Sequence, residues 1–289
     1  MTNGTAASMT DFTVKLADIP VRIRAMDPAM QRFLRAYQSD EAPCFEIRTC
    51  PEDILREREL SARSQAAEGL PEIPASDAYL ETLAIYRKLA EELVERDVLL
   101  FHGSVVALDG QAYLFTAKSG TGKSTHTRLW REVFGERAVM INDDKPLLHV
   151  GQDGATAYGT PWNGKHRLGS NSSAPLKALC LLERDSVNHV EAVSAEEAFP
   201  RLLQQCYWPE DGAKMDKTLT LLERLSRTVK LYRLGCNMER EAALIAYQGM
   251  QEDSYETETR IHYPQGGKHP DDGGDRPCRQ ALSRTDPFQ

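Results

Sequence analysis

The chain has 289 residues, of which 41% are hydrophobic and 27% are charged, and its formal net charge is −8. This composition is typical of a soluble globular protein with one large domain, or with a domain and a smaller N-terminal part. The negative charge argues against nucleic acid and against an anionic membrane as partners. No apolar run is long enough to cross a bilayer, and residues 1–10 lack the features of a signal peptide.

The cysteines also bear on the compartment. They are scattered without CxxC spacing, which argues against a zinc site and, with no secretion signal, predicts reduced thiols in the cytoplasm. The six positions are Cys44, Cys50, Cys180, Cys206, Cys236 and Cys278.

Residues 1–97 predict a small N-terminal α/β extension. Alternating apolar residues over Phe12–Ala25 indicate a hairpin, helical spacing covers Met30–Tyr37, and Cys44–Ile47 is typical of a strand. The charged, proline-containing segment Arg58–Ser76 is expected to be a loop or linker. An apolar stripe over Asp77–Arg96 predicts a long connecting helix.

Residues 98–250 predict the main nucleotide-binding domain. Several strands follow one another through turns, so we expect an α/β class with α+β character: a mixed sheet with flanking helices, not a strictly doubly wound one. The expected strands are Val98–Phe101, Ser104–Leu108, Ala112–Thr116, Ala138–Ile141, Leu147–Val150, Ala155–Tyr158, Leu176–Leu182, His189–Val193 and Val229–Leu234. The expected helices are Thr125–Phe134, one that begins at Ser194, Lys217–Arg227 and Glu239–Gln248. Residues 251–289 have few large apolar side chains and predict a disordered tail.

The most informative segment is the octet Ala-Lys-Ser-Gly-Thr-Gly-Lys-Ser at residues 117–124, between an expected strand and an expected helix. Glycines in such a turn let backbone N–H groups converge on a phosphate, and the helix N-terminus adds its positive dipole. Lys123 is expected to reach the terminal phosphates, and the Ser124 hydroxyl to bind Mg²⁺. Ala117 stands where the common pattern has its first glycine, which is tolerable if the backbone there needs no positive φ. The residues expected to bind the nucleotide are Ser119, Gly120, Thr121, Gly122, Lys123, Ser124 and Thr125.

Three further segments carry candidate catalytic groups. The strand Ala138–Ile141 ends near Asp143 and Asp144, and such a pair suits one carboxylate for the metal and one to accept a proton. The alternative for this pair is a solvated turn. His102 ends the strand Val98–Phe101 and is either a phosphate or proton-handling group or a structural histidine.

The third segment is the loop 159–167, which contains Trp162, Lys165, His166 and Arg167. Phosphoryl transfer needs positive charge on the migrating group, so Lys165 or Arg167 is a candidate clamp, against the alternative of a solvated basic loop. The loop is expected to move over a bound nucleotide, with Trp162 as an apolar contact for a substrate or for the closed state.

These motifs, in the order His102-Gly103, Ser119–Ser124 and Asn142-Asp143-Asp144, resemble the catalytic domain of the HPr kinase/phosphorylase family over roughly residues 98–248. The resemblance implies the fold of that domain, which is related to the ATP-dependent phosphoenolpyruvate carboxykinases. It implies that Lys123 and Ser124 bind phosphate and metal, that Asp143 or Asp144 is the base toward a serine hydroxyl, and that His102 is the nearby histidine. The Gly-Thr-Pro-Trp loop resembles a branch linked to modified-peptide biosynthesis.

Taken together, the sequence predicts a cytoplasmic ATP-dependent kinase, a phosphotransferase with an alcohol group as acceptor. ATP and Mg²⁺ are the expected cofactors, with Ser124 and Asp144 as metal ligands. Asp143, Asp144, His102, Lys165 and Arg167 are the expected catalytic residues. The acceptor is expected to be a serine of a peptide or protein. The alternatives are a small-molecule alcohol and a regulatory nucleotide-binding protein without catalysis, and association into a homo-oligomer stays open.

Overall fold

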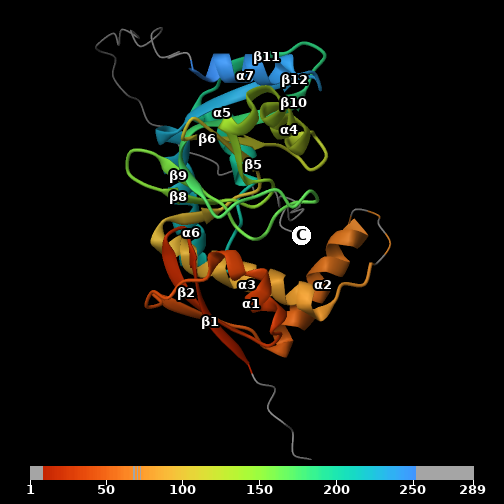
Figure 1. Ribbon diagram of the computed structural model, residues 1–289, viewed down its shortest axis with the longest axis vertical. Helices are drawn as coiled ribbons and strands as arrows, with labels where there is room; N and C mark the ends of the chain where they lie inside the picture. The colour runs from red at the N-terminus through yellow and green to blue at the C-terminus, as the bar shows by residue number, and fades with distance from the viewer. Residues whose placement is uncertain (1–8, 68, 70, 72, 252–289) are drawn as a thin grey trace, which may run out of the picture.

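The computed structural model describes residues 9–67, 69, 71 and 73–251. In Figure 1 the described chain has a smaller N-terminal part, built from β1–β3 and α1–α3, and a larger part built around a curved sheet. The expectations for residues 1–8 and for the tail 252–289 lie outside the described residues.

The N-terminal part begins with the predicted hairpin. Strands β1 (Thr10–Leu16) and β2 (Ile19–Ala25) pair antiparallel, and β3 (Phe45–Arg48) adds to β2 in parallel. The hairpin turn has two residues with positive φ, Ala17 and Asp18. The helical elements that follow are α1 (Ala29–Phe33), the 3₁₀ turn η1 (Arg35–Tyr37), α3 (Asp77–Leu93) and the 3₁₀ turn η2 (Val94–Arg96).

The loop expected over Arg58–Ser76 is wrong for its first half, because α2 spans Pro51–Ala67. The segment is polar, yet Glu, Arg, Leu, Ala and Gln are good helix formers, and its two prolines lie beyond the helix end. A buried ion pair between Glu57 and Arg87 of α3, 2.8 Å apart, attaches the helix to the body. Charge alone therefore did not distinguish a polar helix from a linker.

The larger part is a nine-stranded mixed sheet. The central strand β10 (Ser173–Arg184) is long enough to pair with β9 through its first residues and with β6 and β12 through the rest. It runs parallel to β6 and β12, while β5 runs antiparallel to both β6 and β7. The strands are β4 (Val98–Leu100), β5 (Ser104–Leu108), β6 (Gln111–Thr116), β7 (Ala138–Asn142), β8 (Leu147–Val150), β9 (Ala155–Tyr158), β10, β11 (His189–Ala192) and β12 (Lys230–Cys236).

Helices cover both faces of this sheet. One face packs on α5 and α6 through a cluster that includes Leu179, Leu202 and Leu222, and the other packs on α4 and α7 through Trp130 and Ala243. The helices are α4 (Lys123–Phe134), with the 3₁₀ turn η3 (Gly135–Arg137), α5 (Ala195–Leu203), α6 (Gly212–Thr228) and α7 (Glu241–Gln251). The predicted fold class is confirmed: a mixed α/β sheet with flanking helices, a glycine-rich loop between strand and helix, and an N-terminal α/β extension.

The two parts share an apolar cluster. Val14, Ile23 and Leu89 of the N-terminal part lie in one buried cluster with Leu147 and Trp162 of the larger part. The domain boundaries expected at residues 97 and 250 stay predictions.

Within the N-terminal part, one carboxylate is fully buried and satisfied by hydrogen bonds. Glu81 of α3 is 1% exposed and accepts hydrogen bonds from the backbone N–H groups of Met26 and Asp27 and from the Thr49 hydroxyl. It therefore holds the end of β2 and the segment after β3 on α3.

We expect Glu81→Ala to lower the free energy of unfolding by about 2–4 kcal/mol, because several donors to a charged acceptor lose their partner at once. Urea denaturation measures the change. The control is Glu59→Ala, which removes an exposed carboxylate 3.8 Å from Arg63 and is expected to change stability by less than about 0.5 kcal/mol. A similar small loss for both variants would contradict a structural role for the Glu81 contacts.

Candidate functional site

The predicted phosphate cradle has the backbone that its glycines suggested. Residues 117–122 connect β6 to α4, and Gly120 and Gly122 have φ of 76° and 131°. A side chain is strained at such angles, so glycine is required by the turn itself. Ala117 is absent from the residues with positive φ, which explains how an alanine is tolerated there.

Lys123 is the first residue of α4 and is 8% exposed. Its Nζ donates to the carbonyl oxygen of Ala117 at 2.9 Å, so the ammonium lies folded over the loop. Burial lowers the pKa of Lys123 to about 8, with a further lowering by the charge of Lys145, while Asp144 acts in the opposite sense. Ser124 and Thr125 follow in the first turn of α4, half-buried.

An arginine that sequence reasoning missed holds the loop from outside. Arg184, the last residue of β10, donates from Nε to the carbonyl oxygen of Thr121 at 3.0 Å and from Nη2 to that of Gly120. Because its guanidinium binds the carbonyls of the loop, the carbonyls are kept on that side. Nothing in the sequence near Arg184 signalled this contact, since it depends on the register between β10 and β6.

The two adjacent carboxylates lie just after β7 in different surroundings. Asp143 is 3% exposed, its Oδ1 accepts from the Gly164 N–H at 2.6 Å, and its buried Oδ2 has no hydrogen-bond partner among the described residues. Burial raises the pKa of Asp143, and the charge of Asp144 adds to that effect, against the hydrogen bonds from the backbone of Gly164 and Leu168.

Asp144 is surrounded by nitrogen-bearing side chains. Its Oδ1 lies 3.3 Å from His102 Nε2 and its Oδ2 lies 3.7 Å from Lys145 Nζ. Burial alone raises the pKa of Asp144, but the His102 hydrogen bond and the charges of Lys145 and Lys123 outweigh it, so the pKa is lowered. The neighbouring carboxyls therefore have pKa values shifted in opposite directions, an arrangement found in catalytic acid–base pairs and also in structural ion-pair networks.

His102 is buried and held from both sides of its ring. Its Nδ1 lies 2.9 Å from the side-chain oxygen of Gln205, and its backbone N–H donates to the Gln205 carbonyl at 2.7 Å. Burial is the main cause that lowers the pKa of His102, and the charges of Lys123 and Lys145 add to it. A neutral ring donates from only one nitrogen, so Gln205 and Asp144 compete for a single proton. Gln205 was not predicted, because it is 103 residues away in sequence.

The loop 159–167 is fastened to the carboxylate turn by a buried amide. Asn142, fully buried, accepts at Oδ1 from the backbone N–H groups of Asp144 and Lys145. Its Nδ2 lies 3.0 Å from Thr160 Oγ1 and 3.1 Å from Asn163 Oδ1. Strand end, carboxylates and loop therefore form one hydrogen-bonded unit.

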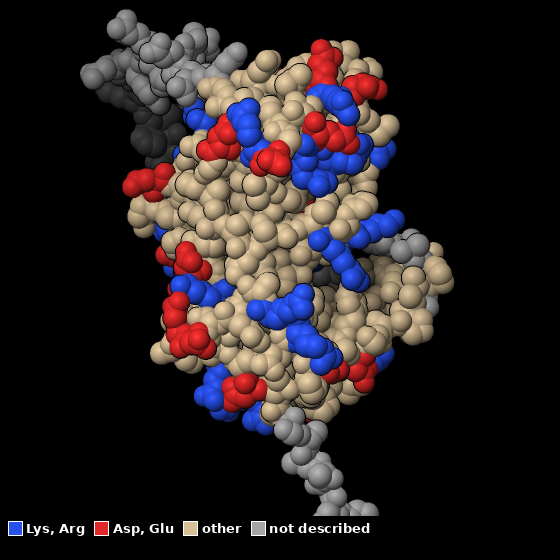
Figure 2. Space-filling model, viewed as in Figure 1, with Lys and Arg blue, Asp and Glu red and all other residues tan. Residues whose placement is uncertain are grey.

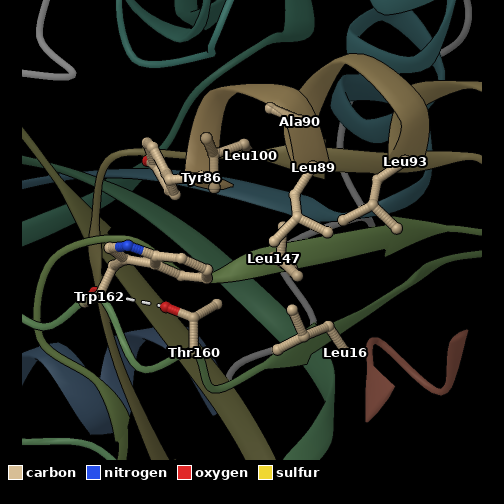
Figure 3. Close-up of a pocket in the computed structure, with 9 residues that line it drawn as sticks. All are labelled: Leu16, Tyr86, Leu89, Ala90, Leu93, Leu100, Leu147, Thr160 and Trp162. Carbon is tan, nitrogen blue, oxygen red and sulfur yellow. Dashed lines mark hydrogen bonds between the residues drawn. The ribbon is translucent and has the colours of Figure 1, made fainter. Parts of the chain in front are cut away.

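The Trp162 side chain is buried against the N-terminal part, so the expected role as a substrate contact is wrong, and the expected movement of the loop stays a prediction. Its Nε1 donates to the carbonyl of Thr82 in α3 at 3.0 Å, and its ring contacts Phe33 and Tyr86 with centroids 5.8 and 5.2 Å apart. Figure 3 shows the indole at a cavity of about 10 Å³, room for one water at most and too small for a ligand. The lining residues are Leu16, Tyr86, Leu89, Ala90, Leu93, Leu100, Leu147, Thr160 and Trp162.

Lys165, His166 and Arg167 are exposed, and among the described residues no hydrogen bond or ion pair holds the side chains of Lys165 and Arg167. In Figure 2, Lys and Arg side chains flank the hollow near the middle of the face shown, although the chain as a whole is acidic. The roles expected for Lys165 and Arg167 stay predictions.

The residues present fit a nucleotide with its metal. The positive-φ glycines fit phosphate, and the unpartnered Asp143 Oδ2 is an oxygen that a cation or a proton would satisfy. No group of three or more His, Cys, Asp or Glu side chains within the described ranges could hold a metal by itself. A metal here would therefore share phosphate oxygens with the protein.

Comparison with known proteins adds little to this geometry. No protein-family model matches the chain, and no curated protein matches its sequence. Among solved structures, the chain is similar to the Hpr(Ser) kinase/phosphatase from Coxiella burnetii, with 8% sequence identity over 53% of this chain and 93% of that chain. The TM-score of 0.29 is too low for this likeness to carry an argument. In the part of the chain that the structure describes, no helix is both long and apolar enough to span a membrane.

We expect Trp162→Ala to lower the free energy of unfolding by about 3–5 kcal/mol, because it removes a large buried ring from the contact between the two parts. Trp208→Ala is the matched control, since that ring is only partly buried, and we expect a smaller loss. Urea denaturation followed by circular dichroism avoids dependence on the tryptophans. A loss below about 1 kcal/mol for Trp162→Ala would contradict the structural role.

Proposed function

We propose that the protein is an ATP-dependent kinase that transfers the γ-phosphoryl group to a hydroxyl, most simply a serine of a peptide or protein. The observation that carries the proposal is the juxtaposition of a glycine-rich phosphate loop with two buried carboxylates whose pKa values are shifted in opposite directions. A nucleotide sensor needs the loop but no proton acceptor, so the buried carboxylate pair supports an enzyme.

In this proposal the cradle N–H groups and Lys123 bind the phosphates. The Lys123 ammonium is close to Ala117 in the structure, and it exchanges that carbonyl for phosphate oxygens. Ser124 and Asp144 would hold Mg²⁺, which neutralises charge on the phosphates when bound.

Asp143 is the proposed base. Its Oδ2 has no hydrogen-bond partner within the described part of the chain and its pKa is raised, so it is the better proton acceptor of the two carboxylates. The acceptor O–H bond breaks with the proton going to Asp143, the acceptor oxygen forms a bond to the γ-phosphorus, and the bond to the β-phosphate oxygen breaks to release ADP. Asp144 stays ionised and orients His102 and Lys145.

A small-molecule alcohol is the second candidate acceptor. The basic side chains beside the hollow suit an anionic partner of either size.

We expect Asp143→Asn to keep nucleotide affinity and to lower phosphoryl transfer about 10²–10⁴-fold, the usual effect of losing a positioned base. Asp144→Asn should lower phosphoryl transfer and also weaken Mg²⁺-dependent nucleotide binding, and its defect should ease at high Mg²⁺ concentration. Calorimetry with Mg-ATP and labelled-phosphate transfer to a panel of peptides and polyols separate the two. Wild-type turnover in both variants would mean that the carboxylate pair is structural and would overturn the proposed mechanism.

A pair of glycines tests the cradle itself. Gly120 and Gly110 have nearly the same φ, 76° and 79°, and an added Cβ meets nothing within 4 Å at either. Each Ala variant should lose about 1–2 kcal/mol of stability, since both force an alanine into left-handed backbone. We expect only Gly120→Ala to weaken Mg-ATP binding, by tenfold or more (about 1.4 kcal/mol), whereas Gly110→Ala in the β5–β6 turn leaves it unchanged. Equal affinities in calorimetry would argue against phosphate binding at this loop.

A further inference from the structure

Lys145 is a buried lysine beside the carboxylate pair to which the sequence assigned no role. It is 8% exposed, and its Nζ lies 3.7 Å from Asp144 Oδ2 and 5.8 Å from the centre of the Tyr86 ring. Long charged side chains are almost never buried this far unless they are paired, and Asp144 is a partner of Lys145.

The backbone of Lys145 is fixed on both sides. Its N–H donates to Asn142 Oδ1 at 2.6 Å, and its carbonyl accepts from Thr160 Oγ1 at 2.8 Å. The side chain therefore starts from a rigid point, which favours catalysis because a positioned charge needs no reorganisation during the reaction.

Charge is unevenly balanced around Asp144. Two lysines, Lys123 and Lys145, act on the one carboxylate of Asp144, and the charge of Lys145 lowers the pKa of Lys123. A phosphoryl group placed beside the two ammonium groups would be stabilised by both of them.

The sequence predicted that cations of the loop 159–167 would stabilise the transferring phosphoryl group. Lys165 and Arg167 are exposed, where salt screens their charge, whereas the buried Lys145 acts through a lower effective dielectric. For the same distance, the buried lysine stabilises developing charge more strongly.

We propose that Lys145 is a catalytic residue of the site, a second phosphate-binding lysine that contacts the transferring phosphoryl group opposite Lys123. The inference rests on the proposed kinase function. In the transfer step written above, Lys145 donates to an oxygen of the migrating group while the bond to the β-phosphate breaks, and it keeps its own proton throughout. Asp144 holds the Lys145 ammonium in place before the nucleotide binds.

The test uses the full chain with three probes: Mg-ADP alone, Mg-ADP with aluminium fluoride as a mimic of the transferring group, and the slow hydrolysis of Mg-ATP with water as acceptor. We expect Lys145→Met to keep Mg-ADP affinity within about threefold, since its charge matters mainly in the transition state. Hydrolysis should fall about 10²–10³-fold and affinity for the aluminium fluoride complex at least about tenfold. Lys145→Arg should recover part of both.

Lys214→Met is the matched control. This lysine also pairs with a carboxylate, Glu92 at 3.0 Å, and is partly buried, but it lies on α6 outside the site. It should leave all three readouts unchanged. Lys145→Gln, which can still donate to Asp144, guards against a misfolded Met variant and should show the same loss of hydrolysis.

The outcomes separate the two proposals. If the wild-type protein binds neither Mg-ATP nor Mg-ADP, the kinase proposal fails and the role of Lys145 fails with it. If the wild type binds nucleotide but Lys145→Met binds the aluminium fluoride complex as tightly as the wild type, the role of Lys145 alone is overturned. A parallel loss of Mg-ADP and aluminium fluoride binding would also overturn it, because that pattern indicates a structural lysine. A loss of hydrolysis in a Lys165→Ala, Arg167→Ala double variant, with none in Lys145→Met, would return the role to the exposed loop.

Discussion

The side-chain amide of Asn142 is the constraint on which the site geometry depends. It is buried in the interior and has polar partners on two sides, the carboxylate turn through its oxygen and the loop 159–167 through its nitrogen. A buried amide costs free energy unless its groups are paired, so the surrounding backbone is selected to supply those partners. Asn142 fixes the backbone of Asp144 and Lys145, and hydrogen bonds from Gly103 to the Asp144 carbonyl and from Thr160 to the Lys145 carbonyl hold the same turn.

The electrostatics of the site then follow from burial. Burial raises the pKa of both carboxyl groups, and nearby cations lower the pKa of one of them below its ordinary value. Asp144 has His102 and Lys145 in contact and remains ionised, while Asp143 has backbone N–H groups and an unpartnered oxygen. Two neighbouring residues of the same type thus acquire different electrostatic surroundings from their partners, which is why the sequence could not assign different roles to them.

Sequence was sufficient wherever the signal is local. The β1–β2 hairpin, the helix Asp77–Leu93 and the strand–loop–helix around Gly120 and Gly122 depend on periodicity or on backbone angles that only glycine tolerates, so they could be predicted. Contacts that join distant segments could not. Gln205 contacts His102 from a segment that lies beside the end of β4, Arg184 contacts the glycine-rich loop through strand register, and Trp162 is buried by α1 and α3. The helix α2 was misjudged because its buried ion pair, Glu57 with Arg87, requires a partner on α3.

A short series of packing contacts and hydrogen bonds connects the N-terminal part to the site. Trp162 is buried against α1 and α3, its neighbour Asn163 bonds to Asn142, and Asn142 positions the carboxylates. Lys145 lies over the ring of Tyr86, an α3 residue that also packs on Trp162. Shifting α3 relative to the sheet would therefore move the lysine and the loop together, because packed interiors transmit displacement and do not absorb it. The extension therefore supports the site directly, through the contacts of Tyr86 with Lys145 and Trp162.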